Sequence, residues 1–221
     1  MENYMNDYLT IALPKGKLFT ISKNLLHRVG LSADHLSEKS RKLVIENEDL
    51  KVRFIIAKTS DVPTYVEYGA ADIGIIGKDV LLESQKDVYE ILDLGFGKCH
   101  LMMAVPQKEK RRRLLDYSYT RVATKYPHIA ESFFARKGMQ MEYIKLNGSI
   151  ELGPIVGLSE SIVDIVETGT TLAENDLEEI AHILDVSARL IVNRVSFKLK
   201  FHRINEIVNN LRPIIESGEI L

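Results

Sequence analysis

Hydrophobic and polar positions alternate in a regular order along the first half of the chain. Residues 9–13 form a short apolar run that ends in Pro14-Lys15-Gly16-Lys17, and the apolar residues that follow recur at helical spacing up to Gly30. This order predicts a strand, a tight loop and an amphipathic helix. Further segments continue the alternation, with strands at 52–57, 72–76 and 88–94 and helices at 62–68 and 78–83. Such a pattern predicts a mostly parallel α/β sheet.

The same pattern restarts in the second half of the chain. It predicts strands at 121–124, 141–146 and 162–166 and helices at 127–137 and 150–158. Strands at 180–185 and 190–192 and an amphipathic helix from about 197 to 216 follow. Because these last segments lack a strand–loop–helix unit of their own, we expect them to pack against the first domain. The chain should therefore form two α/β lobes: domain I from residues 1–103 and 188–221, and domain II from residues 104–187.

Composition and charge exclude several classes of protein. A chain of 221 residues of which 45% are hydrophobic can bury a core without disulfides. Its single cysteine, Cys99, fits a small buried residue in a reducing cytoplasm. The net charge of −2 argues against a general nucleic-acid binder, and the basic run at 108–113 fits a solvated loop. The sequence shows no signal-peptide pattern and no apolar run long enough to cross a membrane.

The strongest chemical signal lies at residues 162–172. A buried strand there carries Asp164 and Glu167, and a hydroxyl-rich turn then pivots on Gly169 before a helix that begins near Leu172. Such a turn can bind one phosphate through backbone N–H groups and threonine hydroxyls at the positive end of a helix dipole. The two carboxylates suit the hydroxyls of a ribose 2′,3′-diol. We interpret the segment as a ribose 5-phosphate pocket, with a simple helix-capping turn as the alternative.

A second group of candidates is cationic. Gly16 permits close approach of the backbone to a ligand, while Lys15 and Lys17 on either side can meet a polyphosphate. Arg41 can bind an anion through two parallel hydrogen bonds. Charged residues in a loop are equally well explained as a solvated surface, so residue type alone leaves both interpretations open.

Three residues of the predicted strand at 72–76 and its end form a third group. Gly74 and Gly77 allow a ligand to approach the backbone closely. Asp72 can accept a hydrogen bond from an adenine amino group, although an aspartate at the end of a strand or at a helix cap explains it equally well. Open α/β sheets bind ligands at the carboxyl ends of their strands, so we expect the site in a cleft between the lobes.

Six segments, in order along the chain, resemble the ATP phosphoribosyltransferases: residues 9–18, 61–67, 71–79, 123–127, 144–152 and 164–172. At two positions where this family often has arginine, the chain has Lys17 and Lys58. These lysines keep the charge but lose the forked geometry of a guanidinium group. The resemblance implies an α/β, two-lobed, periplasmic-binding-protein-like (type II) fold with the active site in the interdomain cleft.

The resemblance also implies a reaction and the residues that take part in it. The expected enzyme is a pentosyltransferase that moves the phosphoribosyl group of phosphoribosyl pyrophosphate to N1 of ATP and releases pyrophosphate, the first step of L-histidine biosynthesis. The expected cations on the leaving group are Lys15, Lys17 and Arg41. Phosphoribosyl pyrophosphate is expected to bind Glu151, Asp164, Glu167, Thr168, Gly169, Thr170, Thr171 and Leu172. ATP is expected to bind Leu13, Lys15, Gly16, Arg41, Asp72, Gly74 and Gly77.

Cofactors and partners follow from the same resemblance. Mg²⁺ is expected to bind mainly through the pyrophosphate oxygens, with no metal site made by the protein alone. A short-form member of the family acts in the cytoplasm, pairs as a homodimer and joins a regulatory subunit that resembles a histidyl-tRNA synthetase. The chain ends at Leu221, where long-form members continue into a histidine-binding domain, so histidine inhibition is expected only with that partner.

Two other functions stay open on the residues alone. The same architecture serves solute binding and effector sensing without catalysis, because a fold does not fix a function. A ribose phosphate pocket also says little about the nucleophile, so phosphoribosyl transfer to another nitrogenous acceptor is a second alternative.

Overall fold

A computed structural model describes residues 8–31, 36–37, 42–110 and 113–218. The chain divides into two compact units: unit 1 comprises residues 1–97 and 187–221, and unit 2 comprises residues 98–186. The boundary expected after residue 103 falls inside strand β6 (Cys99–Pro106), which belongs to unit 2. The apolar run in this strand had not been interpreted as a strand from the sequence.

Unit 1 contains a six-stranded sheet in the order β2-β3-β1-β4-β11-β5. Its strands are β1 (Leu9–Pro14), β2 (Val44–Asn47), β3 (Val52–Ala57), β4 (Ile73–Gly77), β5 (Tyr89–Asp93) and β11 (Ala188–Val192). β1 pairs in parallel with β3 and β4, whereas β2, β5 and β11 pair antiparallel with their neighbours. The expectation of a mostly parallel sheet is therefore wrong. β11 enters directly from strand β10, without the helical crossover that produces parallel pairing.

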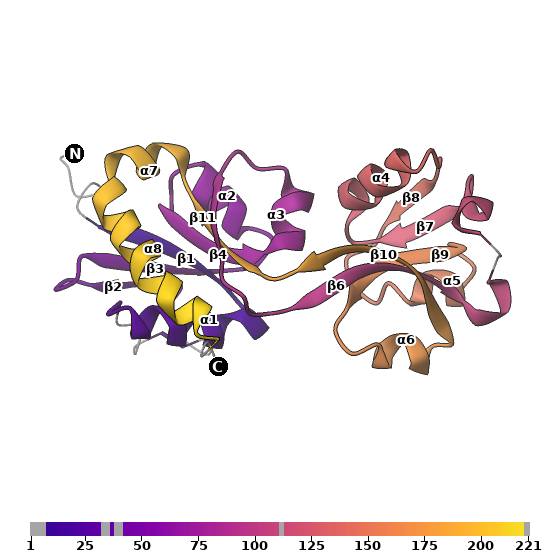
Figure 1. The fold of residues 1–221 in the computed structure, drawn as a ribbon, viewed down its shortest axis with the longest axis horizontal. Coiled ribbons are helices and arrows are strands. Elements are labelled where there is room, and N and C mark those ends of the chain that lie inside the picture. The colour runs from indigo at the N-terminus through magenta and orange to yellow at the C-terminus, as the bar shows by residue number, and fades with distance from the viewer. Residues whose placement is uncertain (1–7, 32–35, 38–41, 111–112, 219–221) are drawn as a thin grey trace. The chain divides into compact units, whose positions relative to one another are not determined.

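Helices cover both faces of this sheet (Figure 1). α1 (Lys17–Arg28) and α8 (Phe201–Glu216) pack in the larger core with Leu25, Leu26 and Ile204. α2 (Val62–Glu67) and α3 (Lys78–Ser84) pack in a second, smaller core. The single helix expected near the C-terminus is two helices, because α7 (Arg194–Leu199) ends before Lys200 and α8 begins after it.

Unit 2 contains a five-stranded sheet in the order β10-β6-β9-β7-β8. The remaining strands are β7 (Arg121–Thr124), β8 (Glu142–Lys145), β9 (Ser161–Val166) and β10 (Leu177–Val186). β7 runs parallel to β8 and β9, and β6 runs antiparallel to β9 and β10. The expected boundaries placed the segment 180–185 in domain II, although the segment was expected to pack against the first domain. It lies in β10 and completes the sheet of unit 2.

Alternate residues of the central strands face two different cores in unit 2. Leu101, Met103 and Val163 pack with α4 (Pro127–Arg136) on one face. Met102, Ala104 and Ile162 pack on the other face, where α5 (Leu152–Ile155) and α6 (Thr170–Glu174) lie. Two short 3₁₀ turns, Gln107–Glu109 and Leu114–Tyr117, follow β6. Because side chains alternate along a strand, Asp164 shares the second face with Ile162.

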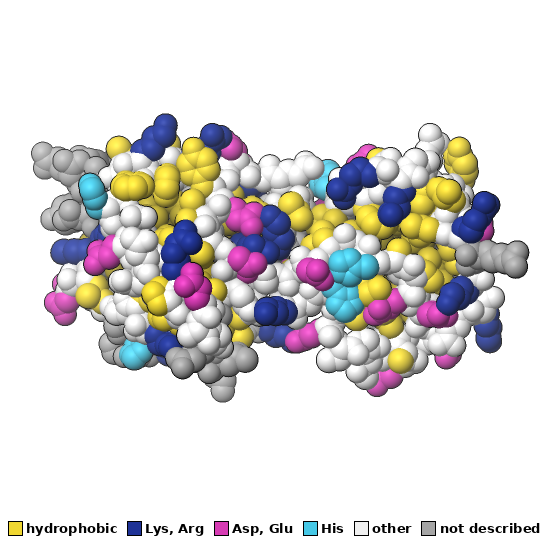
Figure 2. All heavy atoms as spheres, viewed as in Figure 1, with side chains coloured by type: hydrophobic (Ala, Val, Ile, Leu, Met, Phe, Trp, Pro, Cys, Tyr) yellow, Lys and Arg dark blue, Asp and Glu magenta, His cyan; other side chains and the backbone are white. Residues whose placement is uncertain are grey.

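Exposed hydrophobic side chains gather over α7 and the start of α8, as the space-filling view shows (Figure 2). Val195, Leu199 and Phe201 have relative exposures of 62%, 72% and 44%. Grouped apolar side chains of this kind are typical of surfaces that contact another protein. In the part of the chain that the structure describes, no helix is long and apolar enough to cross a membrane.

Candidate functional site

The turn after β9 brings hydroxyl groups and the first backbone N–H groups of a short helix together. Gly169 adopts a left-handed conformation, with φ at 77°, and immediately precedes α6. The hydroxyl oxygens of Thr168 and Thr170 lie 3.0 Å apart on the exposed side of the turn. The first N–H groups of a helix have no acceptor within it. α6 begins two residues earlier than expected, so Thr170 and Thr171 lie in its first turn, while the Leu172 side chain is buried in the core.

Asp164 lies just before this turn in an environment that disfavours its charge. Burial, reinforced by repulsion from Glu151, raises the pKa of the Asp164 carboxyl to about 6. The backbone N–H of Ile165 and the ammonium of Lys125 oppose that rise. The structure therefore brings the two expected ligands Asp164 and Glu151 into one electrostatic neighbourhood. Glu167 follows on the exposed part of the turn.

Lys125 is a member of this neighbourhood that the sequence reasoning did not single out. It directly follows β7, whose last residue, Thr124, is fully buried. The Thr124 hydroxyl donates to the Val163 carbonyl at 2.7 Å and accepts from the Tyr126 backbone N–H at 2.9 Å. The carboxyl ends of β7 and β9 are thus tied together. The signal that could have found Lys125 is its place at the end of a strand parallel to β9.

In unit 1, the cationic loop lies at the carboxyl ends of β1 and β3. The Lys15 backbone N–H donates to the Ala57 carbonyl at 2.9 Å, and the Thr59 hydroxyl donates to the Lys15 carbonyl at 3.3 Å. Gly16 has φ at 92° and precedes α1, and among the described residues no atom beyond its chain neighbours lies within 4 Å of where its Cβ would be. Lys15, Gly16 and Lys17 are all exposed. The structure therefore places the exposed Gly16 backbone and two exposed lysines at one edge of the sheet.

Two of the expected ATP ligands offer no side chain that the structure shows at this edge. The Leu13 side chain is completely buried in the core of unit 1, so only its backbone can face a ligand. Arg41 lies outside the described residues.

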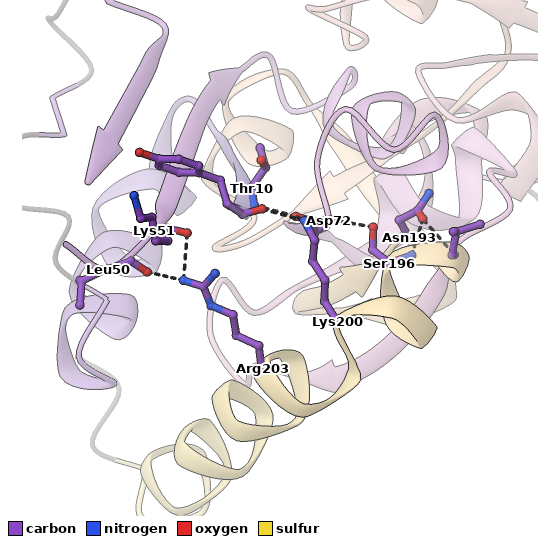
Figure 3. A network of polar contacts seen from close by, with 10 residues as sticks. Thr10, Leu50, Lys51, Asp72, Asn193, Ser196, Lys200 and Arg203 are labelled. Carbon is purple, nitrogen blue, oxygen red and sulfur yellow. Dashed lines mark hydrogen bonds and ion pairs between the residues drawn. The ribbon is translucent and has the colours of Figure 1, made fainter. Parts of the chain in front are cut away.

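Asp72 does not serve as an adenine acceptor in this structure. Its carboxylate accepts hydrogen bonds from the Thr10 backbone N–H at 2.8 Å, the Ser196 hydroxyl at 2.6 Å and the Lys200 ammonium at 2.7 Å (Figure 3). The residue is 5% exposed. It also precedes β4, at the sheet edge opposite to the carboxyl ends of β1 and β4. The structure gives Asp72 the role of fixing α7 and α8 to the sheet. This structural role replaces the expected role as a ligand of adenine.

The two glycines of β4 have separate explanations. A Cβ at Gly74 would lie 2.8 Å from Val66 Cγ2 and 2.9 Å from Val62 Cγ1, so this glycine lets α2 approach the sheet. Packing therefore replaces the expected ligand role of Gly74. Gly77 lies at the carboxyl end of β4, where a Cβ would meet the Asp79 carboxylate at 2.1 Å. Gly77 therefore lies at the same edge of the sheet as the cationic loop after β1.

Solved structures with little sequence similarity share this fold. A substrate binding protein of an amino acid ABC transporter superposes with a TM-score of 0.63 at 12% identity, with 96% of this chain and 95% of that chain covered. The protein Tv2483, solved with L-arginine, superposes with a TM-score of 0.65 at 12% identity, with 97% and 88% covered. The expected two-lobed, periplasmic-binding-protein-like α/β fold is confirmed.

Closer relatives agree on one family. The sequence model of the family described as ATP phosphoribosyltransferase matches residues 58–213. The ATP phosphoribosyltransferase of Desulfitobacterium hafniense is 52% identical, with 95% of this chain and 97% of the relative covered. ATP phosphoribosyltransferase 2 of Geobacter sulfurreducens is 51% identical, with 94% and 98% covered. A chain of the Thermotoga maritima ATP phosphoribosyl transferase (HisG:HisZ) complex superposes with a TM-score of 0.80 at 33% identity, with 95% and 99% covered. The chain therefore belongs to the ATP phosphoribosyltransferase family and is a pentosyltransferase.

Proposed function

We propose that the chain transfers the phosphoribosyl group of phosphoribosyl pyrophosphate to N1 of ATP, and that the turn after β9 holds the donor. The turn residues Thr168, Gly169, Thr170 and Thr171, with the Leu172 backbone, bind the 5-phosphate. Asp164 and Glu167 accept hydrogen bonds from the ribose hydroxyls. The observation that carries this proposal is the left-handed Gly169 between a strand bearing Asp164 and the first turn of α6.

ATP and the leaving pyrophosphate need cations, and unit 1 supplies them. Lys15 and Lys17 flank a glycine that leaves space beside the backbone. Arg41 adds a third cation by resemblance to the family. The Leu13 backbone and Gly77 complete the same edge of the sheet. Asp72 and Gly74 are left out of the ATP site, because protein donors and the packing of α2 account for them.

The chemistry requires positioning and electrostatics rather than a protein nucleophile. Adenine N1 carries a lone pair that attacks the anomeric carbon while the bond to the pyrophosphate oxygen breaks, which inverts that carbon. The barrier lies in separating an anion from an oxocarbenium-like ribose. The carboxylates of Asp164 and Glu167 orient the ribose and face the developing positive charge, and the lysines stabilise the departing anion.

Magnesium fits this site as an ion carried by the substrate. Among the described residues, no group of three or more His, Cys, Asp and Glu side chains is arranged to hold a metal ion. Mg²⁺ is usually held by one or two carboxylates together with substrate phosphates. Glu151, which lies close enough to Asp164 to raise the pKa of its carboxyl, is the residue that would share such an ion. When bound, Mg²⁺ neutralises charge on the leaving pyrophosphate.

A pyrophosphate-release assay tests the activity. The chain, phosphoribosyl pyrophosphate and Mg²⁺ are mixed with ATP or with other nitrogenous acceptors, and release is measured. We expect release that depends on both substrates and occurs with ATP alone among the acceptors. Binding without release would favour a solute-binding role, and release with a different acceptor would favour the other transferase.

The partner is proposed from the resemblance and from one relative. The Thermotoga maritima chain was solved in a HisG:HisZ complex, and 99% of that chain is covered. We infer that homodimers of this chain, acting in the cytoplasm, join a regulatory subunit that resembles a histidyl-tRNA synthetase. Histidine should then inhibit pyrophosphate release by the complex and leave the chain alone unaffected, because coupling needs a second site with different affinities in two states. Saturable histidine inhibition of the chain alone would contradict this arrangement.

A further inference from the structure

Lys125 lies level with the carboxylate that faces the ribose. β7 and β9 are parallel, with Ala123 opposite Ile162 and Thr124 opposite Val163. β7 ends at Thr124, so Lys125 is the residue that directly follows this strand, and Asp164 is the residue that follows Val163 in β9. Ala123 and Ile162 pack in the same core, so alternation places the Lys125 side chain on the Asp164 face.

The Lys125 ammonium is exposed and has no carboxylate within ion-pair distance among the described residues. Its Nζ atom lies 5.8 Å from the centre of the Tyr126 ring. By contrast, Arg121 at the start of the same strand holds Glu160 at 2.6 Å. Lys125 is near enough to Asp164 to lower the pKa of that carboxyl, yet it does not form an ion pair with it. Among the described residues, no carboxylate therefore competes at ion-pair distance with a bound anion for this ammonium group.

The chemistry of the donor identifies that group. In phosphoribosyl pyrophosphate the pyrophosphate on C1 lies on the same side of the ring as the 2-hydroxyl. If Asp164 accepts hydrogen bonds from the ribose hydroxyls, a cation level with Asp164 therefore lies beside the pyrophosphate. Without such a cation, the charges of Asp164 and Glu151 would repel this anion. An ammonium group binds phosphoryl oxygens well as a compact charge with three donors.

We propose that Lys125 is a further substrate-binding residue of this enzyme, and that its ammonium group contacts the C1 pyrophosphate of the donor beside Asp164. The inference rests on the proposed function, because it takes the turn after β9 as the 5-phosphate site. It adds a contact from unit 2 to the leaving group of the donor.

The test compares Lys125→Gln, Lys125→Arg and Lys145→Gln in the full chain. Lys145 is the matched control, because it is an exposed lysine at the end of β8, opposite Thr124 rather than level with Asp164. Equilibrium affinities are measured for phosphoribosyl pyrophosphate, inorganic pyrophosphate and ribose 5-phosphate. We expect Lys125→Gln to weaken the first two by roughly tenfold or more and to change ribose 5-phosphate affinity by less than about threefold. Lys125→Arg should restore most of the loss, and Lys145→Gln should change nothing.

Two results would overturn the inference. Unchanged pyrophosphate and phosphoribosyl pyrophosphate affinity in Lys125→Gln is the first. The second is an equal loss for ribose 5-phosphate, with the acid limb of binding moved to higher pH, since Lys125 would then act only through the charge of Asp164. The proposed function fails separately, if Asp164→Asn leaves ribose 5-phosphate affinity unchanged or the wild-type chain does not bind it.

Discussion

Asp164 shows at the scale of one residue how a binding site opposes stability. Its pKa rises from 3.8 in the unfolded chain to about 6 in the folded one. A group of this kind stabilises the fold fully below the lower value, and the contribution is lost as pH rises through the higher one. At pH 8 the folded protein therefore holds an ionised carboxylate at a cost of up to about 3 kcal/mol. In the proposed site, the ribose hydroxyls of the donor offset this cost by donating hydrogen bonds to the carboxylate.

Asp164→Asn should consequently stabilise the free protein while impairing its function. We expect the free energy of unfolding to increase by about 1–3 kcal/mol at pH 8 and by less at pH 5. Affinity for phosphoribosyl pyrophosphate should fall about ten- to a hundredfold. Urea unfolding at both pH values and calorimetric titration measure these effects. Glu167→Gln is the control, because its exposed carboxylate should lose affinity without the gain in stability. Equal stability of Asp164→Asn and wild type at pH 8 would contradict the prediction that the ionised Asp164 carboxylate destabilises the folded protein.

Asp72 contrasts with Asp164, because its carboxylate stabilises the fold and has a structural role. Asp72→Asn should reduce the free energy of unfolding by about 2–4 kcal/mol, because the partly buried Lys200 ammonium would lose its charged partner. Affinity for ATP should stay near normal in the folded fraction. Chemical unfolding and ATP titration test this pair of outcomes, and a stable variant with weak ATP binding would return Asp72 to the ATP site. Its partners Ser196 and Lys200 lie 124 and 128 residues away, so local spacing could not predict their contacts.

The turn after β9 is the element whose backbone geometry matters most. Gly169→Val should abolish transfer while costing about 1–2 kcal/mol of stability, because a side chain at positive φ is strained. Space is not the obstacle, since the nearest atom to an added Cβ is Glu179 Oε1 at 4.0 Å. Gly138→Val is the matched control: Gly138 has φ at 70° with nothing within 4 Å, at the end of α4. Thermal unfolding and pyrophosphate release should separate the two variants. Loss of activity in both, or in neither, would count against the phosphate role.

The sequence was informative for elements whose signals are local. The strand, loop and helix around Gly16 and the strand and turn around Gly169 follow from periodicity and turn chemistry, and both were predicted close to their observed bounds. The pairing of distant segments could not be predicted in the same way. β6 was missed, and residues 180–185 of β10 were expected to pack against the first domain although the expected boundaries placed them in domain II, because periodicity does not say which strand is the neighbour. Gly74 was misinterpreted for the same reason, since its need for space arises from Val62 and Val66 on α2.

At the scale of the whole molecule, the two units differ in how many segments of the chain form them. Unit 2 is continuous in sequence, and its first and last strands pair so that Cys99 lies opposite Val186. It has cores on both faces of its own sheet. Unit 1 is discontinuous, and β11 from its second segment pairs with both β4 and β5. Residues 1–97 alone would lack an internal strand, whereas residues 98–186 lack nothing from their sheet.

The fragment 98–186 should therefore fold cooperatively by itself and bind ribose 5-phosphate, because the turn, Asp164 and Glu151 all belong to it. The fragment 1–97 should not fold, since β5 would have lost β11, its neighbour in the described sheet. A matched chain replaces residues 98–186 by a short Gly-Ser linker. That linker can close because the Ala188 backbone N–H donates to the Phe96 carbonyl at 2.8 Å. This chain should fold and show no affinity for ribose 5-phosphate. Circular dichroism melting and calorimetric titration of the three proteins are the measurements. A folded 98–186 fragment that fails to bind ribose 5-phosphate would mean that unit 2 does not hold the complete pocket, and the assignment of the turn would have to be abandoned.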